Sequence, residues 1–430
     1  MTCRFLVPLL ACLLLAGCEI PAQTFWAPDG SRAAYLPTSG PDTTLSIIDD
    51  TGNVLANLGP TAGGFAWSND SKRLYFATLG CAPKADGGFE TQYTWLNADE
   101  TDDNPPDNDP DQKRGLTLNL WQDNKTTPLF WLERPTAWYL TLSPDQNWLA
   151  LLTTNPETKD EAGFRLYAFS IPAKRLYPLS VGCGKGACFT APNRLAFFES
   201  TNVRKGQPSD LGQLVEITLL DKPDKPERKS LAGVLIPAVS WVQPAGDDIL
   251  FTCIPMTLPI TLPLDGPEPV HSLFRYSRAD GSLKPVVPGV AEYFMPSPDG
   301  KLLLIVKLDK PAAANAQRAD LAVVELATAA VHLLRDANTT VKEPPNAQYT
   351  GMPAFPAWRT SSEITFTAPV DPQKAPVEKD NRLHFDLVLY RLTPDFKLEP
   401  LRTLSEKWPT EMKPALAKGP HPQPIPDPGF

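Results

Sequence analysis

The sequence predicts an all-β fold, a seven-bladed β-propeller of four-stranded antiparallel blades. Two observations predict it: a two-part β repeat that occurs seven times, and a high proline content. Of 430 residues, 48 are proline and 26 are glycine. Prolines at this frequency separate short strands and disfavour long helices. Beyond about the first 20 residues, no stretch has the periodicity of a capped helix. Rings of six or eight blades are the alternatives.

The first half of each repeat is a strand, a tight turn and a second strand. Proline presets φ at the first turn position, aspartate bonds back to the backbone, and glycine accepts positive φ. Seven segments have this form: 25–36, 65–77, 140–152, 189–198, 239–251, 294–306 and 355–366.

The second half is a hairpin of alternating apolar residues, and it follows each turn-strand half without a break in the order. The hairpins occupy 45–58, 118–132, 164–179, 213–231, 272–287, 320–334 and 386–401. Four short strands cannot bury their faces alone, but radial stacking buries them. The propeller is therefore expected to span residues 25–404, followed by a proline-rich tail over 405–430.

The turn from Ser297 to Lys301 reads SPDGK and precedes an apolar strand. This pattern resembles the TolB-type propeller repeat, and the resemblance covers nearly all of residues 24–404. It implies the propeller fold. TolB itself has six blades and a separate N-terminal domain, whereas only about six residues lie here between Cys18 and the first expected strand. The resemblance therefore implies the fold more strongly than the role.

The N-terminus has the pattern of a lipoprotein signal peptide over residues 1–17. Arg4 is followed by an apolar run that is short for a membrane span. The run ends in LAGC, which resembles the bacterial lipobox. The resemblance implies cleavage before Cys18 and acylation of Cys18, with residues 18–24 as a lipidated linker. Glu19 follows the acylated position, and by family analogy the absence of aspartate there favours the periplasmic face of the outer membrane.

The long insertions all fall between the second and third strands of their units. They occupy residues 80–117, 200–212, 252–271, 309–319 and 368–385. In a propeller these connections leave from one face, which we call the insertion face. The opposite face carries the short turns, and we call it the turn face. Long loops on a rigid scaffold commonly bind something, so the insertion face is the expected functional surface.

Besides Cys18, four cysteines remain after the signal segment: Cys81, Cys183, Cys188 and Cys253. An exported chain meets an oxidising compartment, which favours disulfides. Cys183 and Cys188 flank a short GKGA segment that is expected to be a loop, so this pair is the favoured bond. A bond between Cys81 and Cys253 would span non-adjacent blades.

The acidic run from Asn97 to Gly115 contains Asp107, Asp109 and Asp111 at the odd-position spacing of a calcium loop. The glycine and the bidentate glutamate of that loop are missing. A solvated acidic loop is the favoured interpretation, and weak calcium binding is the alternative. No other cofactor is expected.

Aromatic residues suggest both a binding role and a packing role. Tyr93 and Trp95 lie in the longest insertion and could anchor a partner or pin the insertion to its own blade. Trp67, Trp241 and Trp358 recur at one position of the repeat, so they are expected to pack between neighbouring sheets.

His271 and His384 fall at ends of insertions and complete the candidate binding residues. They lack metal-site spacing, so structural or solvated histidines are the plainer interpretation.

The net charge of -9 and the pI of about 5.1 argue against a nucleic-acid partner. The sequence has no GxSxG motif and no P-loop. It favours a non-catalytic scaffold that binds a protein or an envelope polymer, anchored to the membrane by its N-terminal lipid. A propeller hydrolase or lyase with its site in the central funnel, and an accessory subunit of an envelope complex, are the alternatives.

Overall fold

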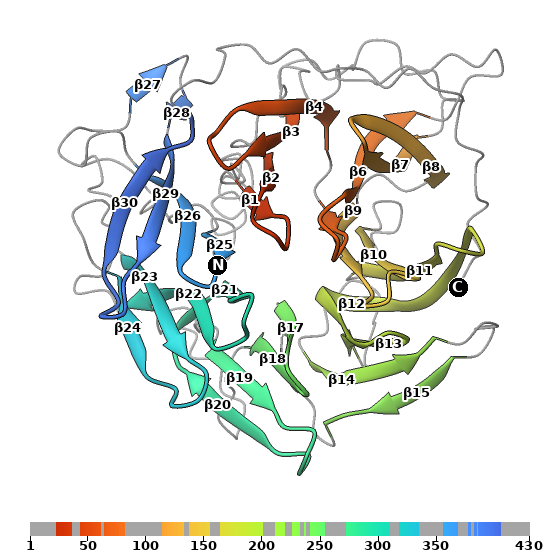
Figure 1. Cartoon of the computed structure of the whole chain (residues 1–430). Helices are drawn as coiled ribbons and strands as arrows, with labels where there is room; N and C mark the ends of the chain where they lie inside the picture. The colour runs from red at the N-terminus through yellow and green to blue at the C-terminus, as the bar shows by residue number, and fades with distance from the viewer. Residues whose placement is uncertain are drawn as a thin grey trace, which may run out of the picture.

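The computed structural model places short β-strands around a common centre (Figure 1). It describes residues 23–36, 44–61, 64–81, 114–132, 137–154, 164–200, 211–219, 226–232, 236–237, 241–253, 272–309, 318–334, 356–368, 377–379, 382–384 and 386–405. Within these ranges no helix is long and apolar enough to cross a membrane. Every sheet is antiparallel, as the alternating apolar pattern predicts.

Five sheets have the predicted form of four antiparallel strands. The first contains β1 (Gln23–Trp26), β2 (Arg32–Leu36), β3 (Thr44–Asp49) and β4 (Val54–Pro60); the second β5 (Phe65–Trp67), β6 (Arg73–Cys81), β7 (Arg114–Gln122) and β8 (Lys125–Leu132). Two further sheets contain β17 (Trp241–Ala245), β18 (Asp248–Cys253), β19 (Ser272–Tyr276) and β20 (Leu283–Val287), and β21 (Val290–Pro296), β22 (Leu302–Asp309), β23 (Arg318–Glu325) and β24 (Val331–Leu333). The last contains β25 (Ala357–Thr360), β26 (Glu363–Ala368), β29 (Asp386–Leu392) and β30 (Leu398–Thr403), with a separate hairpin of β27 (Val377–Lys379) and β28 (Arg382–His384).

The remaining described strands form one larger sheet of eight strands. It contains β9 (Ala137–Leu142), β10 (Trp148–Thr154), β11 (Phe164–Ser170), β12 (Arg175–Ala191), β13 (Arg194–Ser200), β14 (Leu211–Thr218), β15 (Glu227–Ser230) and β16 (Ile236–Pro237). The prediction of seven four-stranded blades is therefore wrong: the described residues form five, and six or eight are wrong as well.

The physical reason is the length of β12, which continues for 17 residues. Its first part pairs with β11 and its second part with β13, with a register shift between Cys183 and Ala187. The GKGA segment that was expected to be a loop is part of this strand. Glycine at positions 182, 184 and 186 allows the strand to bend without breaking.

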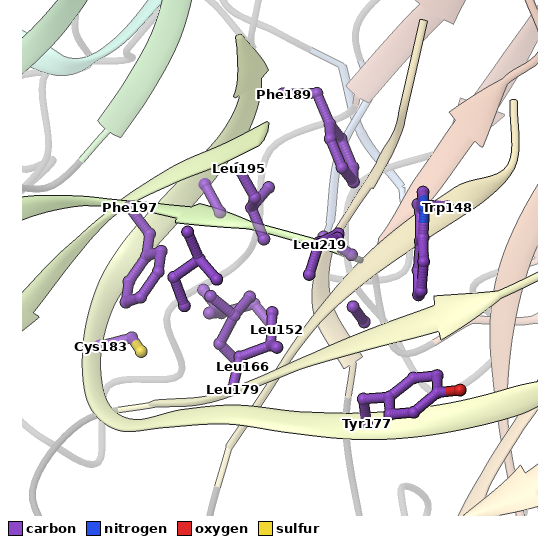
Figure 2. Packing of buried hydrophobic residues seen from close by; sticks show 14 of the residues in the cluster. Trp148, Leu152, Leu166, Tyr177, Leu179, Cys183, Phe189, Leu195, Phe197 and Leu219 are labelled. Atoms are coloured by element: carbon purple, nitrogen blue, oxygen red, sulfur yellow. The ribbon is translucent and has the colours of Figure 1, made fainter. Parts of the chain in front are cut away.

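The bend folds the eight-stranded sheet over its own core (Figure 2). Side chains from β10 and β11 meet side chains from β13 and β14 in a single cluster. Leu152, Leu166, Leu195 and Phe197 are fully buried there. Each such side chain stabilises the fold by about 1.5–3 kcal/mol, so this core holds the two halves of the sheet together.

The predicted turn chemistry is present on the turn face. In the turn after β21, Ser297 Oγ donates to Asp299 Oδ1 at 2.6 Å and accepts the backbone N–H of Leu302 at 2.9 Å. The hydrogen bond from Ser297 lowers the pKa of Asp299 and outweighs the effect of burial. The turns after β5 and β9 repeat this geometry.

The recurring tryptophans pack between neighbouring sheets, which confirms their predicted role. Trp67 Nε1 donates to the carbonyl of Phe25 in the preceding sheet at 2.9 Å. Trp358 Nε1 donates to the carbonyl of Met295 in the same way at 3.0 Å. These bonds fix one sheet against the next.

Three edge strands, and the part of β12 that pairs with β11, share a feature that was not predicted from the sequence. In β8, β12, β20 and β30 a proline is followed by a residue that has no opposite residue in the paired strand, which forms a β-bulge. The prolines are Pro128, Pro178, Pro285 and Pro400. Proline removes a hydrogen-bond donor, and a bulge twists the edge, so both oppose the addition of another strand.

Candidate functional site

The insertion face is built on strand ends that are paired directly with one another. The second and third strands of successive sheets end at six such pairs: Cys81 with Arg114, Thr154 with Phe164, Ser200 with Gly212, Cys253 with Ser272, Asp309 with Arg318, and Ala368 with Asp386. Because the strands in each sheet alternate in direction, every connection between a second and a third strand leaves from the same end of its sheet, which is the insertion face. The predicted placement of the insertions on one face is consistent with this register.

The predicted site residues divide between the described strands and the rest of the chain. Cys81 and Cys253 end β6 and β18, Cys183 and Cys188 lie in β12, and His384 ends β28. Seven candidates lie outside the described residues: Cys18, Tyr93, Trp95, Asp107, Asp109, Asp111 and His271. The structure therefore places two cysteines at the bases of insertions and leaves the aromatic and acidic candidates as predictions.

The favoured Cys183–Cys188 disulfide is not formed, and both residues are free thiols. Cys183 packs into the core inside the folded sheet, whereas Cys188 packs with Cys253 in the cluster against the next sheet. Burial raises the pKa of Cys183 to about 12 and that of Cys253 to about 12, and it also raises the pKa of Cys188. Buried, protonated thiols are unreactive at neutral pH.

A polar cluster that was not predicted from the sequence lies at the end of β13. Glu199 accepts two hydrogen bonds from Arg228 Nη1, at 2.8 and 2.7 Å, and a short one from Ser180 Oγ. Arg228 Nη2 also donates to the carbonyl of Leu179 at 3.0 Å. The arginine thus ties β15 to β12 across the fold of the eight-stranded sheet. The signal in the sequence is a glutamate at the end of the apolar strand RLAFFES.

Polar side chains also replace apolar ones between the first two sheets, at the insertion-face end. Asn119 Nδ2 donates to Thr78 Oγ1 at 2.9 Å. Thr117 pairs with both Thr78 and Trp131 across the sheet, so these side chains share a face. Thr117 Oγ1 and Trp131 Nε1 are buried without a hydrogen-bond partner. Such groups can bind a water molecule that enters between the sheets.

A metal site requires several ligating side chains close together. Among the residues that the structure describes, no group of three or more His, Cys, Asp or Glu could hold a metal ion. The weak calcium candidate lies outside this part of the chain and stays a prediction.

The turn face contains a buried ion-pair network between two sheets. Glu216 of β14 is 5% exposed. It accepts a hydrogen bond from Thr190 Oγ1 at 2.6 Å, and it pairs with Arg278 of the next sheet. Arg194 Nη1 lies 3.9 Å from its other oxygen. Burial raises the pKa of Glu216, but the hydrogen bonds from Arg278 and Thr190 outweigh it, so the pKa lies below its usual 4.5.

This shift predicts a component of acid sensitivity. A carboxyl whose folded-state pKa is depressed stabilises the fold above its unfolded pKa, and this stabilisation is lost as the pH falls through the folded-state pKa. We expect the difference in unfolding free energy between wild type and Glu216→Gln to be constant above about pH 5 and to shrink below pH 4.5. Urea titrations from pH 3 to pH 7 would measure it. A difference that stays constant to pH 3 would contradict the shift.

No protein-family model and no curated protein matches the sequence. Oligogalacturonate lyase from Vibrio parahaemolyticus is 10% identical, with a TM-score of 0.54 over 88% of this chain and 92% of that one. The chain has the β-propeller fold.

Two other solved propellers resemble this one. The β-propeller domain of the trilobed protease from Pyrococcus furiosus is 10% identical, with a TM-score of 0.49 over 88% of this chain and 97% of that one. TolB from Acinetobacter baumannii is 13% identical, with a TM-score of 0.40 over 89% of this chain and 79% of that one. At these identities the likeness concerns the fold, and the function has to be argued from the residues of this propeller.

Proposed function

We propose that this propeller is an exported lipoprotein, anchored through Cys18 to the periplasmic face of the outer membrane. Its insertion face serves as a non-catalytic binding surface for a protein or an envelope polymer. One observation carries the proposal: the connections between second and third strands leave from one face of the ring. The strand residues at which they begin and end are paired directly with each other. A rigid scaffold that presents loops on one side is suited to binding.

The other surfaces of the propeller support the same choice. The outer rim opposes strand addition, because Pro128, Pro285 and Pro400 lie beside bulges in three edge strands. On the turn face, short turns are tied to their neighbours. Ser71 Oγ accepts the backbone N–H of Asp29 at 3.0 Å, and Asn69 Nδ2 donates to the carbonyl of Pro144 at 2.7 Å. The rim therefore disfavours pairing with another strand, and these turns use polar groups to bind neighbouring turns of the propeller.

Replacing single insertions tests the proposal. Cys81 pairs directly with Arg114, so an Asn-Gly turn can substitute for residues 82–113 without moving either strand. Cys253 pairs with Ser272 and allows the same replacement of residues 254–271. We expect at least one replacement to lower partner cross-linking about tenfold, since a few residues dominate most interfaces. Cross-linking of the membrane-bound protein, with the linked residues identified by mass spectrometry, would measure it.

The matched control lies on the turn face, where Lys301 is exposed. Lys301→Glu should leave the cross-links unchanged, and a Cys18→Ser chain should lose them from the membrane fraction. Links that map to the turn face, and that persist in both replacements, would overturn the proposed surface.

A further inference from the structure

The ring closes at one seam, between the first sheet (β1–β4) and the last sheet (β25, β26, β29 and β30). Figure 1 shows these sheets, red and blue, side by side. Among the strands that the structure describes, none belongs to both sheets. Elsewhere around the ring, each sheet is followed in the chain by its neighbour. For example, β20 ends at Val287 and β21 of the next sheet begins at Val290. Within the eight-stranded sheet, β12 belongs to both halves. The seam therefore depends on side chains and packing.

Arg359 makes three polar contacts across this seam. Its Nε donates to the carbonyl of Gly30 at 2.9 Å, and its Nη2 donates to Asp50 Oδ2 at 2.8 Å. The guanidinium also lies 5.5 Å from the centre of the Trp26 ring. On its own sheet, Glu363 holds the remaining nitrogen at 2.5 Å. The side chain is only 16% exposed, so these bonds are partly shielded from water.

Buried contacts continue the seam towards the core. Trp26 Nε1 donates to Thr365 Oγ1 at 2.9 Å. Trp26 and Tyr35 of the first sheet share one hydrophobic cluster with Leu387 and Leu389 of the last sheet. This cluster resembles those between other sheets, so packing alone does not set the seam apart.

Chain connectivity does set it apart. When the contact between two sheets breaks, a short linker keeps each sheet at a high effective concentration near the other, so the contact forms again readily. The seam joins residues 329 and 339 positions apart in sequence and has no such tether. We propose that the seam is where this ring opens first, in a sub-global opening that precedes unfolding, and that Arg359 is the latch that limits it.

Hydrogen exchange of the full chain tests the latch. In Arg359→Gln the amides of β1 and β25 should exchange about tenfold faster than in the wild type, because charge-assisted bonds to Gly30 and Asp50 are lost. Arg73→Gln is the matched control. Arg73 bridges to Gln146 between two turns of sheets that the chain joins, so the amides of β5 and β9 should change less than threefold.

A second variant tests the seam independently if Arg359→Gln fails to fold. Asp50→Asn removes the negative charge from one seam contact and leaves Arg359 in place, and it should speed exchange of β1 and β25 about threefold. Equal acceleration in all sheets, or no acceleration at the seam in either variant, would overturn the proposal.

Discussion

Glu216→Ala is expected to lower the free energy of unfolding by about 3 kcal/mol. The substitution leaves Arg278 without its carboxylate partner at the boundary of the core. It also removes the shorter of two hydrogen bonds from Thr190 Oγ1, which keeps only the Arg194 carbonyl at 3.4 Å. Removing one member of a buried ion pair is costly because the other charge stays desolvated. The network joins the eight-stranded sheet to the next sheet, so the loss should affect the whole ring. Urea denaturation followed by tryptophan fluorescence would measure it.

Glu399→Ala provides the control for Glu216→Ala. Glu399 lies exposed on β30, where replacement of a surface carboxylate should change stability by less than about 0.5 kcal/mol. If Glu216→Ala cost no more than this control, the ion pair would contribute nothing measurable to the contact between the sheets.

Gly52→Ala is the second substitution with a large expected effect. Gly52 lies in the turn between β3 and β4 at φ +89°, and a Cβ there would meet the carbonyl oxygen of Leu404 at 2.1 Å. Leu404 follows β30 in the last sheet, so the clash falls on the seam. We expect a loss of about 4 kcal/mol, from positive-φ strain and from overpacking against backbone. The shift of the urea midpoint would measure it.

Gly281→Ala separates the two causes. Gly281 has φ +67°, but nothing lies within 4 Å of its Cβ position. It should lose only the strain of about 1 kcal/mol. Equal losses at both glycines would show that the close approach of Gly52 to Leu404 is unimportant for ring closure.

Local chemistry determined much of the fold. The Ser-Pro-Asp-Gly turn at Ser297 forms the hydrogen bonds that its residue types predict, because all partners lie within five positions. Trp67 and Trp358 were correctly predicted to pack between sheets, because a large apolar ring that recurs at one repeat position must face a neighbour. The antiparallel sheets arranged in a ring follow from the same repetition.

Long-range pairing decided what the sequence could not. Whether residues 182–188 turn or continue as a strand depends on the partner that β13 offers to β12, and hydrogen bonds between distant strands leave no local signature. The site residues show the same division. Glu199 meets Arg228 only because the sheet bends. Arg359 meets Gly30 only because the ring closes.

The sequence alone therefore determined the strands, their turns and the alternation of their faces, since these depend on neighbours within a few residues. The tertiary structure decided the number of separate sheets, the state of the cysteines and the ion pairs across the seam. These depend on contacts between residues tens to hundreds of positions apart, which only the folded chain brings together.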